Sequence, residues 1–447
     1  MQNIFHSTTS SCTSGLTEVI SPKTGIVKSV GNLLRSPEEP APHIVTSSIT
    51  AFHRFSGNKA DFASTGTSID ITQAHWSSLG ESIERYCAAL ADFQTLTYDS
   101  YSGLKAKGHT PLPLEKFTLF SSDQYAQSKF PFTYATDHSK LSWIAGNRLS
   151  DNTTVSVPAG FVFNQFRPKT NELRLCPDIH PGVASSFSKT RALTGALLEI
   201  VERDTMMIHW LNQIPVTGIA HDEDFQRIRK QFKLPPQLKL YLALLETDIQ
   251  VPCMFALLLD EKNGLLGGGC SAGFNAVHAA KKAVCEAIQI LRLSKEVQNG
   301  AKGKLASKKA IPSAFLDPAA RAKLPMTELL YNLGFYLNPQ NWKHLEDFLS
   351  PQQQIQLCEC KSHQYATDYQ RLLENFINVG LEPVCIDLTT EDVADIGWQV
   401  VRVVAPGAVP NLPTLYPPKA VSRLWTVPRK LGFSTPSEWN TLPMPYA

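Results

Sequence analysis

Residues 195–204 read Gly-Ala-Leu-Leu-Glu-Ile-Val-Glu-Arg-Asp, and the pattern Glu-x-x-Glu-Arg within them also occurs at residues 81–85. Each acidic position of the second copy follows its counterpart by the same 118 residues (199 − 81 and 202 − 84). Positions i, i+3 and i+4 of a helix share one face, so each copy presents two carboxylates and a guanidinium together. Such a set can hold a divalent cation and a phosphate oxygen.

The second copy predicts a helix over about 190–212 that is largely buried. Its apolar residues between 192 and 208 cover an arc of roughly 200°, which confines the polar groups to a stripe of Glu199, Glu202 and Arg203. Buried carboxylates are costly unless they are paired or metal-bound, so this helix favours a functional site. The first copy has an ordinary amphipathic pattern, and a solvated surface helix remains open for it.

Composition indicates a globular protein of 447 residues, with 43% hydrophobic residues, 18% charged residues and a net charge of +2. This balance argues against a nucleic-acid partner, and no apolar run approaches the ~18 residues of a membrane-spanning helix. Nine cysteines at irregular spacing indicate a reduced, cytoplasmic protein without zinc. Length alone suggests two or three domains, and residues 1–20 have the composition of a flexible tail.

The rest of the chain predicts strands, loops and a third helix, with no P-loop sequence anywhere. The third helix, over 277–293, carries Glu286, Gln289 and Arg292 at i, i+3 and i+6, and a surface position remains open for it. The glycine-rich stretch 264–273 is either a phosphate cradle or a bulged strand with a turn. Further expectations are a small-residue loop at 63–68, strands at 143–148, 155–163, 238–245, 250–259, 381–387 and 398–405, an irregular segment at 173–189, a solvated helix or linker at 294–325, helical spacing at 326–350 and a disordered, proline-rich end.

Taken in order, several of these segments resemble the YcaO family over about residues 60–447. The segments are Gly66-Thr67, Ser77-x-x-x-Glu81-x-x-Glu84-Arg85, Trp143-Ile-Ala-Gly146, Ala192 to Glu199-x-x-Glu202-Arg203-Asp204, Glu286-x-x-Gln289-x-x-Arg292 and Val401-Arg402-Val-Val-Ala-Pro-Gly407. The resemblance implies an α/β fold, with mixed β-sheets and packed helices in two pseudo-related halves around a buried ATP and Mg²⁺ site. It implies one YcaO domain over 21–447, with core motifs at 60–410 and a proline-rich C-terminal segment at 406–447.

The resemblance also implies a set of site residues. Catalytic roles fall to Glu81, Glu199, Glu202 and the C-terminal Ala447, and Mg²⁺ ligation falls to Glu81, Glu84, Glu199, Glu202 and Glu286. Nucleotide contacts fall to Ser77, Glu84, Arg85, Arg203, Gln289, Arg292 and Arg402. The chain departs from the family at Thr65, where lysine is common, at residues 180–182, which read His-Pro-Gly in place of Ser-Asn-Gly, and at residues 443–447, which keep two prolines of a P-x-P-x-P ending.

The activity implied by the resemblance is an ATP-dependent cyclodehydratase that converts Cys, Ser or Thr of a ribosomally made peptide to thiazoline or oxazoline. The alternatives are formation of a thioamide or an amidine by the same ATP chemistry, and a non-catalytic subunit of a peptide-modifying complex. The expected partners are a precursor peptide with a leader, a separate ubiquitin-activating-like (ThiF-like) protein that binds the leader, and, as further candidates, a flavin dehydrogenase and a second copy of the chain. No membrane partner is expected.

Overall fold

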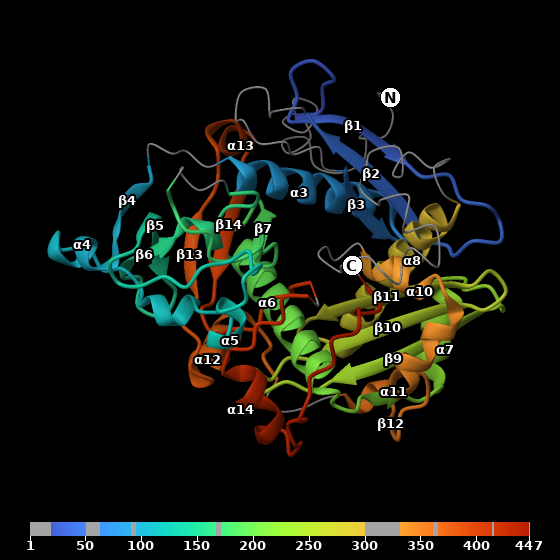
Figure 1. The fold of residues 1–447 in the computed structure, drawn as a ribbon. Helices are drawn as coiled ribbons and strands as arrows, with labels where there is room; N and C mark the ends of the chain where they lie inside the picture. Colours follow the sequence, from blue (N-terminus) through green and yellow to red (C-terminus); the bar gives the residue numbers. More distant parts are fainter. Residues whose placement is uncertain are drawn as a thin grey trace.

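The structure, a computed structural model, describes residues 19–50, 63–90, 95–166, 171–299, 331–360, 365–413 and 415–446, and it contains three β-sheets (Figure 1). The first sheet is antiparallel and has the order β1-β2-β3, with β1 at Val27–Asn32, β2 at His43–Ile49 and β3 at Ala63–Ser68. The second has the order β11-β10-β9-β8-β12, with β8 at Thr217–Ile219, β9 at Leu238–Leu245, β10 at Cys253–Asp260, β11 at Leu265–Ala272 and β12 at Gln353–Ile355. The third has the order β4-β5-β13-β14-β7, with β4 at Thr97–Ser100, β5 at Lys140–Arg148, β6 at Thr154–Pro158 paired with β5, β7 at Val183–Ser186, β13 at Val384–Asp387 and β14 at Gln399–Val404.

Three long helices accompany these sheets, α3 at Ile71–Ala89, α6 at Lys189–Asn212 and α8 at Ala276–Gln298. The shorter α-helices are α4 at Tyr101–Ala106, α5 at Ser122–Tyr125, α7 at Glu223–Gln231, α10 at Tyr331–Tyr336, α11 at Glu346–Leu349, α12 at Tyr369–Asn378, α13 at Glu391–Asp395 and α14 at Arg423–Lys430. Most residues of α6 are buried, as its apolar arc predicts. The mixed α/β fold class is confirmed.

Each sheet has an edge strand that leads directly into one of the long helices. β3 precedes α3, β7 precedes α6 and β11 precedes α8, and each helix packs against the strand that precedes it. Each helix also contacts the strand of another unit, since α3 contacts β7, α6 contacts β11 and α8 contacts β3. The three strand–helix units therefore close into a ring around the middle of the molecule, as Figure 1 shows. The doubled motif in the sequence thus marks two of three similar units.

Small residues in the edge strands allow the helices to pack closely. A Cβ atom at Gly66 of β3 would meet the backbone of Ala74 and Ser78, so the predicted loop at 63–68 is wrong and the segment is a strand under α3. The glycine-rich stretch is likewise a regular strand, paired with β10 along its whole length. A Cβ atom at Gly267 or Gly269 would meet the backbone of α8, which explains the glycines without a bound phosphate.

Replacing Gly267 with alanine is expected to destabilise the protein by roughly 1–3 kcal/mol, because the new methyl group would force α8 away from β11. Gly31 is the matched control, since it also lies in a strand but has open space around its Cβ position. Urea unfolding should show a lower midpoint for Gly267→Ala and a nearly unchanged midpoint for Gly31→Ala. Equal midpoints for the two variants would contradict the packing argument.

Several other predictions can be compared with the structure. The strands β5, β6, β9, β10, β13 and β14 and the helix α8 lie where the sequence predicts them, within a few residues. β7 lies inside the segment predicted to be irregular, and residues 331–349 form two short α-helices and a 3₁₀ helix at Pro339–Leu345 rather than one helix. Residues 1–18 of the predicted tail 1–20, residues 300–325 of the predicted solvated helix or linker 294–325, and Ala447 lie outside the described residues. Residues 294–298 belong to α8.

The C-terminal segment is ordered and buried, so the prediction of a disordered end is wrong for the described part of it. Residues 443–446 are all buried, and α10 and α6 hold their main chain. Tyr336 Oη donates to Pro443 O at 2.6 Å, Asn332 Nδ2 donates to Tyr446 O at 2.9 Å, and Trp210 Nε1 donates to Leu442 O at 2.7 Å. These hydrogen bonds replace the regular pairing that prolines prevent.

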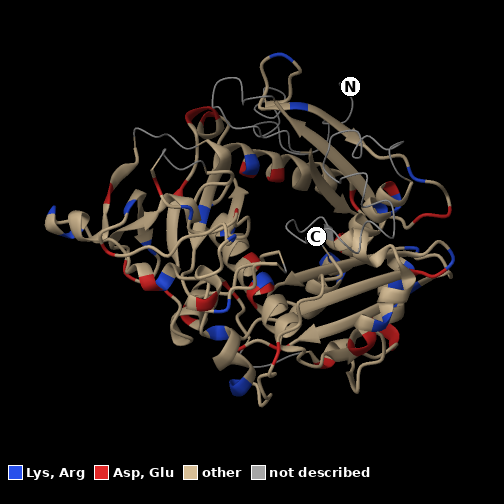
Figure 2. Ribbon diagram, viewed as in Figure 1, with Lys and Arg blue, Asp and Glu red and all other residues tan. Residues whose placement is uncertain are grey.

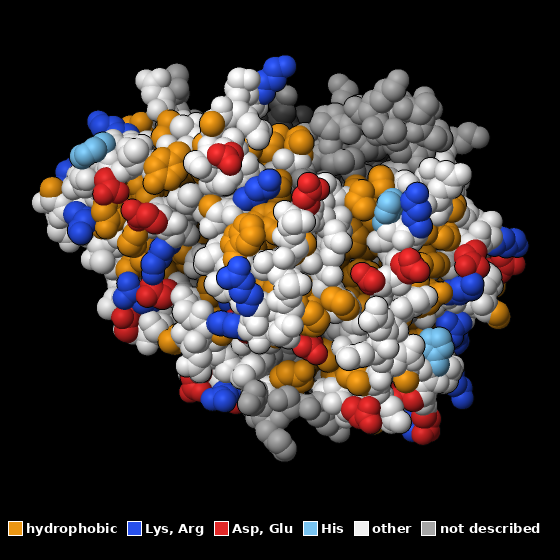
Figure 3. Space-filling view, turned by 60° about the horizontal axis from the view of Figure 1, so that its bottom comes forward, with side chains coloured by type: hydrophobic (Ala, Val, Ile, Leu, Met, Phe, Trp, Pro, Cys, Tyr) orange, Lys and Arg blue, Asp and Glu red, His pale blue; other side chains and the backbone are white. Residues whose placement is uncertain are grey.

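Within the described ranges, no helix is both long and apolar enough to cross a membrane. On the face shown in Figure 3, acidic and basic side chains are interspersed, with hydrophobic side chains scattered among them.

Candidate active site

The three long helices carry a glutamate at the same position, 11 residues after the N-cap residue (70 to 81, 188 to 199 and 275 to 286). Each of these glutamates accepts a hydrogen bond from a backbone N–H of the preceding strand or its first flanking residue. Thr65 donates to Glu81 at 2.6 Å, Gly182 donates to Glu199 at 3.0 Å, and Cys270 donates to Glu286 at 3.3 Å. Backbone N–H groups of the ring therefore hold the three glutamates at equivalent positions of their helices.

The residue one helical turn later faces the neighbouring unit of the ring. Glu84 of α3 accepts from Ser185 N of β7 at 2.7 Å, and Gln289 of α8 accepts from Thr67 Oγ1 of β3 at 3.0 Å. Glu202 of α6 stands at the same position but differs, because its Oε1 has no hydrogen-bond partner in the part of the chain that the structure describes. Glu202 is therefore the acid at this helix position whose Oε1 makes no hydrogen bond within the described residues.

Arg203 is the nearest cation to Glu202, with Nη2 at 3.1 Å from Oε1 in an ion pair that lacks hydrogen-bond geometry. Its guanidinium lies 4.8 Å from the centre of the Tyr446 ring, so the buried C-terminal segment forms one wall of the site. Nη1 of Arg203 is buried and has no hydrogen-bond partner among the described residues. A carboxylate oxygen and a guanidinium nitrogen of one ion pair that both lack a hydrogen bond among the described residues suit a cation and an anion bound together.

The carboxylates raise one another's pKa. Burial, followed by the charge of Glu199, raises the pKa of Glu84 to about 8. Burial also raises the pKa of Glu202 to about 8 and raises the pKa of Glu286, although nearby cations oppose both shifts. A bound cation would relieve this repulsion, because it favours the ionised carboxylates.

No three carboxylate, imidazole or thiol groups within the described ranges lie close enough together to form a metal site by themselves. Mg²⁺ is usually held by one or two carboxylates together with substrate phosphates and water rather than by an all-protein cage. Two pairs of acids on neighbouring helices, Glu84 with Glu199 and Glu202 with Glu286, suit that mode of binding. Figure 2 shows acidic and basic residues together where α3 and α6 face the middle of the molecule.

Replacing Glu84 with glutamine is expected to raise the melting temperature of the ligand-free protein at pH 7.5 and to leave it unchanged at pH 4. The folded-state pKa is about 8, against an ordinary value of 4.5, so ionisation destabilises the fold increasingly as the pH rises from about 4.5 to about 8. Below pH 4.5 the carboxyl group is protonated in both states and contributes no difference. Thermal unfolding at the two pH values checks this, and a variant less stable than the wild type at pH 7.5 would contradict it.

Two further residues of the site were not predicted as site residues from the sequence, namely His180 and Lys282. Protein atoms crowd both side chains, yet solvent still reaches both. Burial, followed by the charges of Arg85, Arg402 and Arg203, lowers the pKa of His180 to about 4. His180 is thus a neutral imidazole among cationic side chains, and an anion bound there would raise its pKa.

The remaining predicted residues lie at different distances from this centre. Arg85 donates to Ala63 O at 2.8 Å and pairs with Glu81 at 2.5 Å, so the first copy of the motif is partly neutralised internally. Ser77 is exposed on α3 one turn before Glu81 and accepts from Gln73 Nε2 at 3.4 Å.

Arg402 is buried in β14 and donates to three backbone carbonyls. These belong to His180 at 3.0 Å, Phe161 at 2.9 Å and Ile179 at 2.7 Å. Gly182, two residues after His180, has a φ of 96°, a conformation that favours glycine. In this conformation its N–H donates to Glu199. Arg402 therefore supports the loop that presents His180 and Gly182 to the site.

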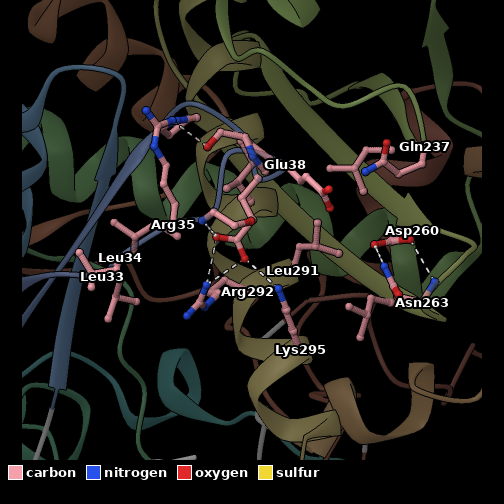
Figure 4. Close-up of a pocket in the computed structure, with 18 residues that line it drawn as sticks. Leu33, Leu34, Arg35, Glu38, Gln237, Asp260, Asn263, Leu291, Arg292 and Lys295 are labelled. Atoms are coloured by element: carbon pink, nitrogen blue, oxygen red, sulfur yellow. Dashed lines mark hydrogen bonds and ion pairs between the residues drawn. The ribbon is translucent and has the colours of Figure 1, made fainter.

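Arg292 belongs to another group of charges. It pairs with Glu39 at 3.0 Å and with Glu296 at 3.3 Å, and Lys295 joins Glu39 at 2.8 Å. Glu39, Arg292 and Lys295 line a cavity of about 140 Å³ between the β1–β2 connection and α8 (Figure 4). The structure thus brings together Glu84, Glu199, Glu202, Arg203 and Glu286 and places Arg292 with Glu39.

With this geometry in hand, comparison with known proteins identifies the family. A family model described as YcaO cyclodehydratase, ATP- and Mg²⁺-binding, matches residues 65–409. The chain belongs to the YcaO family. The binding of ATP and Mg²⁺ inferred from the resemblance agrees with this description of the family. A comparison with curated proteins finds no match.

Several solved structures share the fold. A heterocyclase in complex with substrate and cofactor is 20% identical, with a TM-score of 0.76, over 97% of this chain and 57% of that chain. YcaO from Methanopyrus kandleri bound with AMPPCP and Mg²⁺ is 18% identical, with a TM-score of 0.58, over 86% of each chain. A chain of the E. coli microcin synthetase McbBCD complex is 13% identical, with a TM-score of 0.59, over 85% of this chain and 87% of that chain. The present chain therefore spans little more than half of the length of the heterocyclase.

Proposed function

We propose that this YcaO protein catalyses ATP-dependent cyclodehydration of Cys, Ser or Thr residues in a ribosomally made precursor peptide, giving thiazoline or oxazoline. The observation that carries the proposal is the convergence of acids from α6 and α8 on Arg203, beside a buried C-terminal segment. The heterocyclase that matches 97% of this chain supports the choice of ring formation within the family.

The residues present suit a Mg²⁺-nucleotide. Glu202 and its neighbours Glu199 and Glu286 would hold the cation, because Glu202 has an oxygen without a donor and burial opposes its charge unless a cation is present. Arg203 would hold a phosphate oxygen through its unpartnered Nη1, with His180 on the same side of the site. Bound ATP supplies the phosphoryl group that converts a peptide amide oxygen, otherwise a poor leaving group, into a good one.

The protein's own contribution is positioning and electrostatics. Glu199 and Glu286 are held by backbone N–H groups, so their carboxylates are oriented before any ligand binds. Tyr446 packs on the guanidinium of Arg203 and limits the orientations that it can adopt. The attacking thiol or hydroxyl group belongs to the peptide, so the proposed reaction requires no protein nucleophile.

Mass spectrometry of the peptide tests the proposal. The chain, with a ThiF-like leader-binding protein and a precursor peptide encoded beside it, is incubated with ATP and Mg²⁺. Loss of one water that tandem fragmentation places at Cys, Ser or Thr supports cyclodehydration, and exchange of oxygen for sulfur would indicate a thioamide. An amidine also forms with loss of one water, but fragmentation would then show a ring closed by the peptide's N-terminus. An unmodified peptide with no Mg²⁺-dependent ATP turnover would instead favour a non-catalytic subunit.

The partner proteins form part of this proposal. The E. coli microcin synthetase chain that shares the fold is part of a complex named McbBCD, which supports assembly with other subunits for the present chain as well. A ThiF-like leader-binding protein remains the first candidate partner, followed by a flavin dehydrogenase and a second copy of the chain. Co-expression followed by size-exclusion chromatography distinguishes these assemblies by mass.

A further inference from the structure

Two buried side chains of α10 hold the C-terminal segment 443–446 by its carbonyl groups. Tyr336 Oη donates to Pro443 O at 2.6 Å, and Asn332 Nδ2 donates to Tyr446 O at 2.9 Å. Tyr336 is 2% exposed and Asn332 is 1% exposed, so water cannot take the place of either donor. The two hydrogen bonds therefore fix the first and the last residue of the segment to the same short helix.

The strand β11 supports the segment as well. A Cβ atom at Gly268 would meet Pro445 O, so the main chain of the segment lies directly on this strand. Gly268 faces away from α8, because successive residues of a strand point to opposite sides and its two neighbours approach α8. Two residues further along β11, Cys270 donates the hydrogen bond that holds Glu286. The position of the segment is thus tied to the strand that also orients an acid of the site.

The last described residue of this segment contacts Arg203. The Tyr446 ring is 2% exposed, and its centre lies 4.8 Å from Cζ of Arg203. Nη1 of Arg203 makes no hydrogen bond among the described residues, so the ring, rather than a hydrogen bond at Nη1, limits the orientation of the guanidinium. A shift of the segment would therefore change the direction in which Arg203 points. The region matched by the family model ends at residue 409, before the segment begins.

We propose that Asn332 and Tyr336 are positioning residues of the candidate active site, which act on Arg203 through the C-terminal segment. The inference rests on the proposed nucleotide site and adds two residues of α10 that determine how well Arg203 binds a phosphate oxygen. Neither of them needs to touch a ligand, because the segment transmits their effect. Gly268 permits the same arrangement from β11, since any larger residue there would displace Pro445.

Hydrogen exchange of the ligand-free full chain, measured by mass spectrometry, tests the first step. Tyr336→Phe removes one hydroxyl group, and the amides of Met444 and Tyr446 are expected to exchange about 3-fold to 10-fold faster. Tyr86→Phe is the matched control, because it removes another tyrosine hydrogen bond, to Asp392 at 2.8 Å, and should leave exchange in the segment unchanged. Equal exchange in the wild type and in Tyr336→Phe would overturn the proposal.

Isothermal titration calorimetry with AMPPCP and Mg²⁺ tests the second step without turnover. Tyr336→Phe is expected to weaken binding by about 3-fold to 10-fold, whereas Tyr86→Phe should bind as the wild type does. Gly268→Ala should weaken binding as well, because it displaces the segment from β11 without changing α10. Tyr336→Phe combined with Tyr446→Ala should bind as Tyr446→Ala alone does, since the ring through which Tyr336 acts is then absent.

The double variant distinguishes positioning from a merely structural role. If the losses of affinity from Tyr336→Phe and Tyr446→Ala add, Tyr336 acts independently of the ring and the proposal is overturned. An unchanged affinity for either single variant would overturn it too. A wild type that binds no Mg²⁺-nucleotide would refute the proposed nucleotide site, and the inference would fall with it. That result is distinct from a wild type that binds the nucleotide only as tightly as Tyr336→Phe does.

Discussion

Replacing Arg423 with alanine is expected to lower the free energy of unfolding by about 3–5 kcal/mol, because buried Asp204 would lose its counter-charge and buried Asp248 would keep only the exposed Lys430. Arg423, at the start of α14, donates to both oxygens of Asp204, at 2.9 and 2.6 Å, and to Asp248 at 2.7 Å. The side chain of Asp204 is fully buried and that of Asp248 is 8% exposed, so water cannot replace the lost donors.

Lys430 provides the matched control, because it pairs with the same Asp248 at 3.3 Å but is 54% exposed. Lys430→Ala is expected to change stability by less than about 1 kcal/mol, since exposed ion pairs contribute little. Arg423→Lys should fall between the two, because one ammonium group cannot reproduce the paired donors of a guanidinium. Urea denaturation of the three variants gives this order, and equal midpoints for Arg423→Ala and Lys430→Ala would contradict it.

The ion pairs of Arg423 also affect the candidate active site. Asp204 follows Arg203 directly in α6 and accepts a further hydrogen bond from Val409 N at 2.8 Å. It therefore fixes the helix, the segment after β14 and α14 to one another next to the residue that pairs with Glu202. We expect Arg423→Ala to reduce the affinity for nucleotide as well, since a looser α6 would hold Arg203 less well.

The elements that could be predicted from the sequence are those whose residues carry strong periodicity. α6 has an apolar arc long enough to identify a buried helix, and β9 has the bounds that its apolar run predicts. β3 and β11 were harder to predict from the sequence, because small residues like theirs are also typical of a loop or a phosphate cradle. The reason for those residues is the close approach of α3 and α8, a contact that only the folded chain shows.

The C-terminal segment illustrates a second limit. Its prolines exclude regular pairing, so the sequence predicts a mobile end, but side chains of α10 and α6 bind its carbonyl groups. Such side-chain donors come from residues more than 100 positions away, and no local pattern indicates them. The contact of Tyr446 with Arg203 could not be predicted from the sequence for the same reason.

For the site, the repeated spacing indicated the acids on α3 and α6, and a third copy of the register was present but incomplete. Counting from the N-cap residues aligns Glu286 with Glu199 and Gln289 with Glu202. Arg292, at i+6 from Glu286, lies off this face, which explains why it pairs with Glu39.

Glu202→Gln is expected to reduce ATP-dependent modification of the peptide by at least about 100-fold while leaving the protein folded. Glutamine has nearly the same size as glutamate but cannot supply the negative charge that a divalent cation requires. Oε1 of Glu202 makes no hydrogen bond among the described residues, so it is the oxygen that a bound cation would satisfy. Because burial raises its pKa to about 8, removal of the charge should leave the melting temperature of the ligand-free protein equal or higher at pH 7.5.

The experiment compares Glu202→Gln with Glu296→Gln, which changes the same kind of side chain in α8 where it pairs with Arg292 away from the acids. The wild type and Glu296→Gln should gain melting temperature when Mg²⁺ and ATP are added together, and Glu202→Gln should gain little. Peptide mass after single incubations then reports activity. An active Glu202→Gln enzyme would remove this residue from the site, and an unfolded one would contradict the expectation that the fold does not need this carboxylate.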